Sequence, residues 1–569
     1  MNDLWNGPGA AHRRTIYKGA GYSDHDIRTK PHIGIANAFT EVSPAHAHLR
    51  ILADAVKQGV WEAGGLPLEF GVPATCGNVA MGTEEMKYEL AGRDVVAMSI
   101  EFVSRVHAFD GLVMLSSCDN IIPGQMLAAA RLDIPSVLLT GGPMYPGAWR
   151  GRKVLTPDIN VYGLSGVLPG EFEEMEDAAC PGYGACAVMG TANTMQILSE
   201  VLGFSLPGTS TIPAATAARI RTAREHGRAA VNLIKRGMRP REMVKRGNIL
   251  NAVVADLAIG GSTNAVLHLL SLARDLDIDL SLDDFGTLGK QIPCICAVRP
   301  NGPHTIVDLY QEGGVPAVLA ALAGKLDLDT QDVTGVSLRE RFAGTPVSPR
   351  GRADAVAGSP GGCVAEKEKS RGEVIKTLDD PVTRSSGLAV LKGNLAPDGA
   401  IIRSSGVPAG MRRFSGPAKV FHNDSDGLRG VEGGEVVPGD VIVIRYEGCR
   451  GAPGMKEIML TTDAMVARGL DRSVGLVTDG RFSGFNYGPI VGHVSPEAMD
   501  GGPIALVENG DVITVDIDRG ILQLEVPGPE LERRKAMWRR PAPKTTRGLL
   551  ALYAATCRPA HEGGAMQNW

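Results

Sequence analysis

The stretch Leu112–Met144 places the tightest constraint on how this chain can fold. It begins with a short apolar run, Leu112–Leu115, which is typical of a buried parallel strand. Cys118-Asp119-Asn120 follows, and Pro123-Gly124 then opens a helical segment, since proline suits the first helical turn. A second apolar run, Ile134–Thr140, completes the unit. The pattern predicts strand, helix and strand, with a thiol beside a carboxylate at the sheet edge where open α/β sheets bind ligands.

The flanking sequence extends this unit into a large α/β domain. We predict strands over 31–38 and 66–72, helices over 43–65 and 84–107, irregular surface over 145–175, a helix from about 191, mainly helices to 275 and a further α/β stretch to 325. The first of these helices would have Ser43 as its N-cap and Pro44 in its first turn.

A second domain is predicted after a polar, Gly/Pro/Arg-rich segment at roughly 340–385. From about 386, short apolar runs alternate with Gly/Asp/Pro turns, which indicates β-rich structure. The fold class is therefore α/β with a smaller β-rich C-terminal domain. We place the domains at 1–375 and 376–569.

Composition excludes several classes of function. The net charge is -5 and no basic run occurs, which argues against nucleic acid as a partner. No apolar stretch reaches the ~18 residues of a membrane helix, and the N-terminus MNDLWNGPGAAHRR has no apolar signal core, so we expect a cytoplasmic protein. The nine cysteines lack regular short spacing, which favours reduced thiols, some of them metal ligands, over a disulfide framework.

Six blocks of this sequence resemble one known family. The first contains Cys118-Asp119 and the Gly-Gly-Pro-Met that follows the second apolar run. The other five are residues 181–208, 257–270, 438–448, 474–484 and 492–511. In sequence and in order they resemble the dihydroxy-acid dehydratase/6-phosphogluconate dehydratase family, which includes sugar-acid dehydratases. The resemblance implies an N-terminal α/β domain that holds the cofactor and a C-terminal β-barrel domain. It also implies a homodimer or tetramer, with active sites near the subunit contact.

Three thiols on separate loops, Cys76, Cys118 and Cys186, are the candidate ligands of an iron–sulfur cluster. Thiolates are soft ligands suited to such clusters. Three cysteines on a [4Fe–4S] cluster leave one iron open, and that iron can act as a Lewis acid on a substrate hydroxyl. The alternative for any one thiol is a small buried apolar residue.

We assign Cys76 as a cluster ligand because the first cluster cysteine of the family is missing from its usual position and a cysteine is present in the next block. Many relatives carry the first cluster cysteine in Asn-Pro-Cys-x-x-His, whereas this chain has Ser43-Pro44-Ala45-His46. PATC (73–76) instead resembles Pro-Ala-Met-Cys of the 6-phosphogluconate branch, which favours [4Fe–4S] over [2Fe–2S]. Cys180 and His46 remain alternative ligands, although a histidine on the polar face of a helix is more typically solvated.

Three carboxylates, Glu101, Asp119 and Glu447, match the Mg²⁺ positions that the resemblance implies. Oxygen ligands suit Mg²⁺, which would grip the substrate carboxylate and its 2-hydroxyl group. The fourth ligand of the family is a carbamylated lysine directly after Cys-Asp, but this chain has Asn120, a neutral amide. For Glu101 the alternative is an exposed helix charge.

The segment VTDGRFSG (477–484) resembles the family segment that holds a serine base, here Ser483. A serine needs a nearby cation or metal to favour its alkoxide. Arg481 could bind a substrate carboxylate or form a salt bridge. Gly260-Gly261-Ser262-Thr263-Asn264 precedes a helix and could hold an anion, or simply be a capped helix start.

These residues together predict a hydro-lyase that converts a 2,3-dihydroxy carboxylic acid into a 2-keto acid. Ser483 would remove the C2 proton, the cluster iron would draw off the C3 hydroxyl as water, and the enol would tautomerise. GGSTNAVLHLL looks nearest to the branched-chain branch and PATC to the 6-phosphogluconate branch, so a sugar acid is the alternative substrate. An inactive family member, motivated by Ala45 and Asn120, and an iron–sulfur sensor are the alternatives of other classes.

Overall fold

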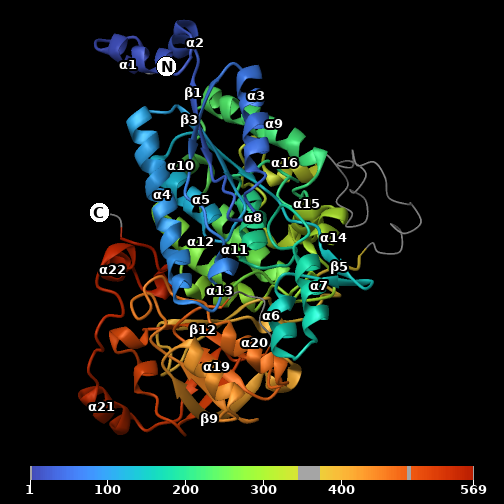
Figure 1. The fold of residues 1–569 in the computed structure, drawn as a ribbon, viewed down its shortest axis with the longest axis vertical. Helices are drawn as coiled ribbons and strands as arrows, with labels where there is room; N and C mark the ends of the chain where they lie inside the picture. The colour runs from blue at the N-terminus through green and yellow to red at the C-terminus, as the bar shows by residue number, and fades with distance from the viewer. Residues whose placement is uncertain (1–2, 344–371, 483–487, 568–569) are drawn as a thin grey trace.

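The computed structural model describes residues 3–343, 372–482 and 488–567. It has an N-terminal α/β domain with a parallel sheet and a C-terminal domain built on a barrel-like sheet, so the predicted fold class is confirmed (Figure 1). Most of the predicted interdomain segment lies outside the described residues, and the boundary at 375/376 stays a prediction.

The N-terminal sheet has four parallel strands in the order β2-β1-β3-β4. Every residue of β1, β3 and β4 is buried, because helices cover both faces of the sheet. The strands are β1 (His32–Asn37), β2 (Leu66–Gly71), β3 (Gly111–Ser116) and β4 (Ser136–Thr140), close to the runs predicted from sequence.

The crossover helices cover both faces of this sheet. α3 (Leu49–Glu62) connects β1 to β2 in one direction and packs against α9 (Ala217–Arg236). α4 (Tyr88–His107) connects β2 to β3, and α5 (Ile121–Leu132) connects β3 to β4, so both lead toward the β4 edge of the sheet. These two helices pack together. The predicted helix over 43–65 therefore starts only at Leu49, and Ser43 is not its N-cap.

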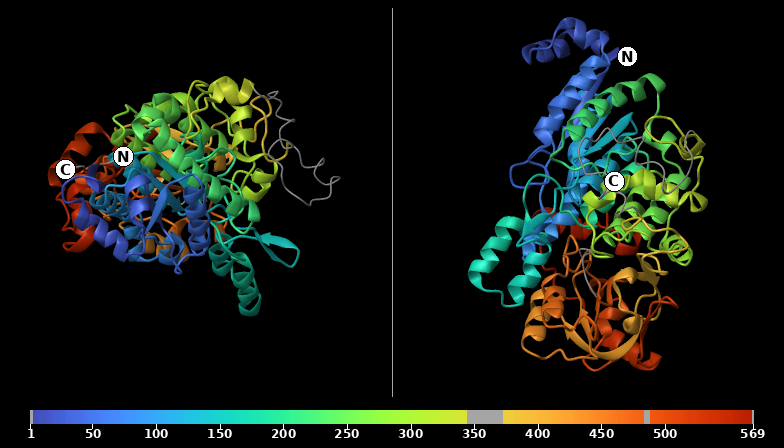
Figure 2. Two further views of the ribbon diagram at one scale, coloured as in Figure 1. Left: turned by 90° about the horizontal axis from the view of Figure 1, so that it is seen from above. Right: turned by 90° about the vertical axis from the view of Figure 1, so that its right-hand side faces the viewer.

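The remaining helices of the N-terminal domain form a further layer and a projecting end. Helices α1 and α2 project from the end of the molecule opposite the barrel (Figure 1, Figure 2). The segments are η1 (Asp3–Trp5), α1 (Ala10–Gly19), α2 (Asp24–Thr29), η2 (Gly77–Ala80), η3 (Glu84–Lys87), α8 (Thr191–Val201), α10 (Pro240–Met243), α11 (Arg246–Ile259), α12 (Asn264–Asp275), α13 (Leu282–Gly289), α14 (Ile306–Gln311), α15 (Gly314–Ala321), η4 (Ala323–Lys325) and α16 (Leu338–Ala343).

Two sequence predictions about this domain are wrong. The segment 145–175 is not irregular, since it holds a hairpin and two helices: β5 (Gly147–Trp149), β6 (Arg152–Val154), α6 (Asp158–Leu164) and α7 (Pro169–Ala179). The stretch from 276 to 325 is helical with isolated bridges and has no named strand. Short polar helices that pack on only one side give a weak apolar period, which explains the first error.

The C-terminal sheet has eight strands in the order β14-β13-β9-β10-β11-β12-β8-β7. Its two edges meet through Lys392, which donates to Gly520 O at 2.9 Å and accepts from Leu522 N at 2.9 Å, so the sheet nearly closes into a barrel. Pairs β9-β10, β10-β11 and β11-β12 are parallel. The strands are β7 (Ala389–Leu391), β8 (Gly399–Ile402), β9 (Arg413–Phe421), β10 (Val441–Ile444), β11 (Gly475–Thr478), β12 (Ile490–Ser495), β13 (Val512–Asp516) and β14 (Ile521–Leu524).

The end of the chain ties the two domains together. Gly563 O accepts hydrogen bonds from Arg93 at 3.2 Å and from Ser271 at 2.9 Å, and Met566 N donates to Asp94 at 3.3 Å. The helices of the C-terminal domain are η5 (Ser404–Gly406), η6 (Ala409–Met411), α19 (Asp424–Glu432), α20 (Leu460–Ala467), η7 (Ala498–Asp500), η8 (Pro503–Leu506), α21 (Gly528–Met537), α22 (Gly548–Thr556) and η9 (Ala560–Glu562).

A second contact between the domains joins α6 to α20. Because it contains a partly buried aspartate, we expect the stability of the folded protein to depend on pH. Burial raises the pKa of Asp463 to about 7, although Asn160 donates to its carboxylate at 3.2 Å. An unfolded aspartate titrates near pH ~4, so Asp463 favours the folded state at low pH and this contribution is lost as the pH rises to about 7. We expect Asp463→Asn to raise the melting temperature at pH 8 by at least about 2 °C, and by less at pH 5. Glu435→Gln, at an exposed site, is the control for thermal melts and should change neither value.

Candidate active site

The candidate site lies where the carboxyl ends of two sets of parallel strands face each other. Cys76 and Cys118 follow β2 and β3 of the N-terminal sheet, whereas Glu447 and Arg481 follow β10 and β11 of the barrel. Contacts cross between the two sides: Asn264 Nδ2 donates to Glu457 Oε1 at 2.8 Å. The predicted ligand-binding edge of the N-terminal sheet therefore faces loops of the barrel.

The three predicted thiols come together from separate loops. The Cys118 thiol donates a hydrogen bond to Cys76, and this contact lowers the pKa of Cys76 to about 6. Asn78 Nδ2 lies 3.3 Å from Cys186 Sγ. Burial and the nearby charges of Cys76 and Asp119 raise the pKa of Cys186 to about 12. A bound metal centre would stabilise the thiolate form of these closely placed thiols.

The alternative ligands Cys180 and His46 occupy different surroundings. Cys180 is exposed at the C-terminal end of α7. His46 is fully buried, which corrects the expectation of a solvated helical side chain, and its Nε2 accepts from the backbone N–H groups of Ser117 and Cys118 at 3.0 and 3.1 Å. Burial lowers the pKa of His46 to about 3, so the ring is neutral and can accept both bonds. His46 therefore positions the Cys118 loop.

Asp119, next to Cys118, lies among other acidic groups. Burial raises its pKa to about 8, and the charges of Glu457 and Glu89 add to the increase, while Arg481 opposes it. Asn120 Nδ2 donates to Glu89 Oε2 at 3.3 Å, and both side chains are buried. Glu89 was not among the predicted site residues.

The structure does not bring Glu101 to this group. Glu89 and Glu101 are both in α4, and a rise of 1.5 Å per residue separates them by about 18 Å along the helix. Glu101 lies toward the end of α4 where His107 contacts Tyr17 of α1 at 2.9 Å, away from the barrel. The helix prediction was correct, and Glu101 lies about three helical turns from Glu89.

The barrel contributes Arg481, which is almost fully buried. Its Nη1 donates to Glu457 Oε1 at 2.9 Å and its Nε to Met455 O at 2.7 Å, so the predicted salt bridge exists. Its Nη2 has no hydrogen-bond partner among the described residues and could bind a substrate carboxylate. Ser483, two residues further on, lies outside the described residues.

The predicted glycine-rich loop before α12 leads into Asn264, the residue that contacts Glu457 of the barrel. Ser262 Oγ lies 2.7 Å from Thr191 Oγ1, and Asn264 N lies 3.2 Å from Ser262 Oγ. Thr263, the N-cap of α12, makes no side-chain capping bond, and Thr263 Oγ1 and Asn264 Oδ1 are buried without partners among the described residues, so the anion site and the capped helix start both stay predictions.

Glu447 is buried in a neighbouring part of the cleft. Its Oε1 accepts from Lys544 at 3.2 Å, and its Oε2 has no partner among the described residues. Burial raises the pKa of Glu447 to about 7, against the charges of Lys544 and Lys456. Lys456 also contacts Glu84 at 3.3 Å, which links the barrel to the segment before α4. A cavity of about 360 Å³ lies beside Glu447 and is lined by His422, Tyr446, Gly451, Met499, Pro541, Ala542 and Lys544.

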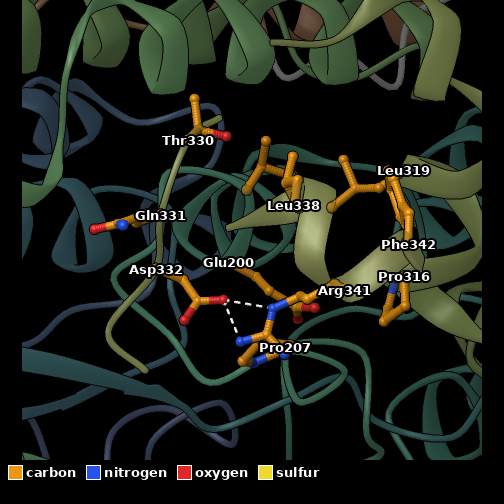
Figure 3. A pocket seen from close by; sticks show the side chains of 11 residues that line it. Glu200, Pro207, Pro316, Leu319, Thr330, Gln331, Asp332, Leu338, Arg341 and Phe342 are labelled. Carbon is orange, nitrogen blue, oxygen red and sulfur yellow. Dashed lines mark hydrogen bonds and ion pairs between the residues drawn. The ribbon is translucent and has the colours of Figure 1, made fainter. Parts of the chain in front are cut away.

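A second cavity belongs to another part of the molecule. It lies among α8, α15 and α16, where Arg341 pairs with Asp332 at 2.6 Å (Figure 3). Its volume of about 60 Å³ has room for only a few water molecules, so it is too small for an organic acid.

The residues present fit a metal-containing cofactor, judged by their chemistry and by atoms left without partners. The three thiols are soft donors, and Asn120 Oδ1 and Glu447 Oε2 are buried oxygen atoms without hydrogen bonds. Among the described residues no three His, Cys, Asp or Glu side chains converge on a single metal ion.

Sequence reasoning missed Glu89, Lys456 and Glu457. Glu89 is an acidic residue in the first turn of a helix that follows the Cys76 loop, which is the signal that could have identified it. Lys456 and Glu457 follow no predicted motif, and only the packing of the barrel against the N-terminal domain brings them to the cleft.

Comparison with known proteins agrees with a cofactor-dependent lyase of two domains. The Dihydroxy-acid/6-phosphogluconate dehydratase N-terminal model matches residues 30–341, and the corresponding C-terminal model matches residues 373–564. A dihydroxy-acid dehydratase of Ignicoccus hospitalis is 43% identical over 100% of this chain and 99% of its own length. One of Methanothrix thermoacetophila is 44% identical over 99% of each chain. One of Acetivibrio thermocellus is 40% identical over 98% of each.

The two family models and the full-length relatives show that the chain is a dehydratase, a hydro-lyase that acts on a small molecule. The chain belongs to the dihydroxy-acid/6-phosphogluconate dehydratase family. Membership supports a metal or iron–sulfur cofactor in general. No helix in the described part of the chain is long and apolar enough to cross a membrane.

Proposed function

We propose that this enzyme dehydrates a 2,3-dihydroxy carboxylic acid to a 2-keto acid. The observation that carries the proposal is the meeting of Cys76, Cys118 and Cys186 beside Asp119, in a chain whose full-length relatives are named dihydroxy-acid dehydratases. A branched dihydroxy acid is the first candidate substrate.

Cys76, Cys118 and Cys186 would hold an iron–sulfur cluster, with [4Fe–4S] favoured over [2Fe–2S]. The support is that three thiols, and not four, meet at the site, while the fourth nearby thiol, Cys180, is exposed. When bound, such a cluster supplies a Lewis-acidic iron that helps a hydroxyl group leave.

The protein's own side chains would bind the substrate and move its C2 proton. Nη2 of Arg481 would donate to one carboxylate oxygen, because it is a buried N–H group without a partner among the described residues, while Nη1 of the same side chain pairs with Glu457. Ser483 would accept the C2 proton, with the positive charge of Arg481 nearby in sequence to favour the alkoxide. Asp119 and Glu447 would bind Mg²⁺. Glu101 is left out of this set because of its distance along α4.

A homodimer or tetramer is the proposed assembly. Met98, Phe102 and Val106 recur every four residues along α4 and are 38%, 68% and 65% exposed. An exposed apolar stripe of this kind is typical of a subunit contact.

A sugar acid is the second candidate substrate, because PATC resembles the 6-phosphogluconate branch. Anaerobically purified protein should be tested for 2-keto acid formation with branched 2,3-dihydroxy acids, aldonic acids and 6-phosphogluconate. We expect the branched acid to give the highest kcat/KM. Preference for an aldonic acid would transfer the assignment to that branch, and no turnover with any of them would support an inactive family member.

A further inference from the structure

Glu89 is a buried carboxylate that the proposed reaction does not yet use. It is 7% exposed and lies in the first turn of α4, where Gly77 packs against its carboxylate and Thr75 donates a hydrogen bond to it. A residue larger than glycine at position 77 would bring its Cβ within 3.4 Å of Glu89. The loop that carries Cys76 therefore encloses this side chain.

Two acidic side chains lie close together in this part of the site. Glu89 and Asp119 repel each other electrostatically, and no ion pair among the described residues neutralises either of them. The nearby cation, Arg481, is already paired with Glu457 at 2.9 Å. The hydrogen bonds that Glu89 receives from Thr75 and Asn120 come from neutral groups, so a cation shared with Asp119 would relieve the repulsion between the two carboxylates.

Asn120 supplies an independent indication of a ligand. Its Nδ2 is used by Glu89 at 3.3 Å, whereas its Oδ1 is buried and has no hydrogen-bond partner among the described residues. The side chain is only 2% exposed, so water does not reach it freely. A neutral oxygen beside two carboxylates is a donor set that hard divalent cations prefer.

We infer that Glu89 is a ligand of a divalent cation that it shares with Asp119, with Asn120 Oδ1 as a neutral donor. Since the amide of Asn120 brings no charge of its own, Glu89 is the carboxylate that holds the cation beside Asp119 on the N-terminal side of the site, whereas Glu447 belongs to the barrel side. The presence of the cation rests on the proposed function. The inference adds Glu89 as a residue that holds this cation.

The test is Mn²⁺ binding to the iron-loaded protein, followed by EPR of the free ion, with iron per chain measured on each sample. Glu89→Gln keeps the size and the contact with Asn120 but removes the charge, and we expect it to weaken Mn²⁺ binding at least about tenfold. Glu101→Gln is the matched control, the same change on the same helix, and should bind as the unsubstituted protein does. Iron content should stay the same in both variants.

Unchanged Mn²⁺ affinity in Glu89→Gln would overturn the inference, and so would a loss of iron without a loss of Mn²⁺ binding. If Glu89→Gln does not fold, Glu89→Asp is measured in the same assay. Its shorter side chain moves the carboxylate away from the cation, so we expect weaker Mn²⁺ binding. Unchanged affinity would again overturn the inference. Turnover of the unsubstituted protein, measured on the same preparation, reports on the proposed function separately. Active protein whose Glu89→Gln variant binds Mn²⁺ normally would contradict only the inference.

Discussion

Replacing Cys76 by serine should remove most of the iron from the anaerobically purified protein and reduce turnover below detection. The unsubstituted protein should contain about four iron atoms per chain, as a [4Fe–4S] cluster requires. Cys76 is the thiol whose pKa is lowered to about 6, so it is the one of the three that is mainly thiolate at neutral pH. A serine hydroxyl cannot replace this soft ligand.

Cys180→Ser is the matched control, because Cys180 is also a loop thiol near the site but is exposed. It should keep its iron and its activity. The measurements are iron and acid-labile sulfide per chain, with EPR before and after reduction. About two iron atoms in both the unsubstituted protein and Cys76→Ser would indicate a [2Fe–2S] site held by other residues, and the relocation argument for Cys76 would then be wrong.

Ser483→Ala should lower kcat by roughly 10³-fold while leaving the iron content unchanged. General base groups contribute about 10²–10⁴-fold to such reactions, and alanine cannot accept the C2 proton. Exchange of the substrate C2 proton with deuterium oxide measures that step directly and should disappear together with turnover.

Ser473→Ala serves as the control for this experiment. Ser473 is a half-buried serine before β11 whose hydroxyl lies 3.4 Å from Leu470 O, away from the cleft-facing loop. It should keep both exchange and turnover. If Ser483→Ala retained C2 exchange but lost turnover, Ser483 would act after proton removal, and the assigned base would have to be a different residue.

Local pattern was sufficient for the strands β1 to β4 and for the three thiol loops. Each strand is a short apolar run bounded by small residues, and each thiol follows a strand or a glycine-rich turn, so the signal lies within about ten residues of sequence. The same reasoning failed for 145–175, where short helices and a hairpin show no strong apolar period. It also failed for His46, because a histidine on a polar-looking segment gives no sign that backbone N–H groups of Ser117 and Cys118 will surround it.

The sequence by itself determined the fold class, the family and the candidate thiols, since these depend on residue type and on spacing along the chain. The tertiary structure alone decided which carboxylate of α4 lies beside Asn120. Glu89 and Glu101 are both acidic residues on one helix, and no local rule distinguishes them, but the direction of α4 brings only Glu89 to Asn120. The same holds for the pairing of Asn264 with Glu457, which are 193 residues apart. Electrostatic partners are fixed by distance in space, and packing between domains sets that distance.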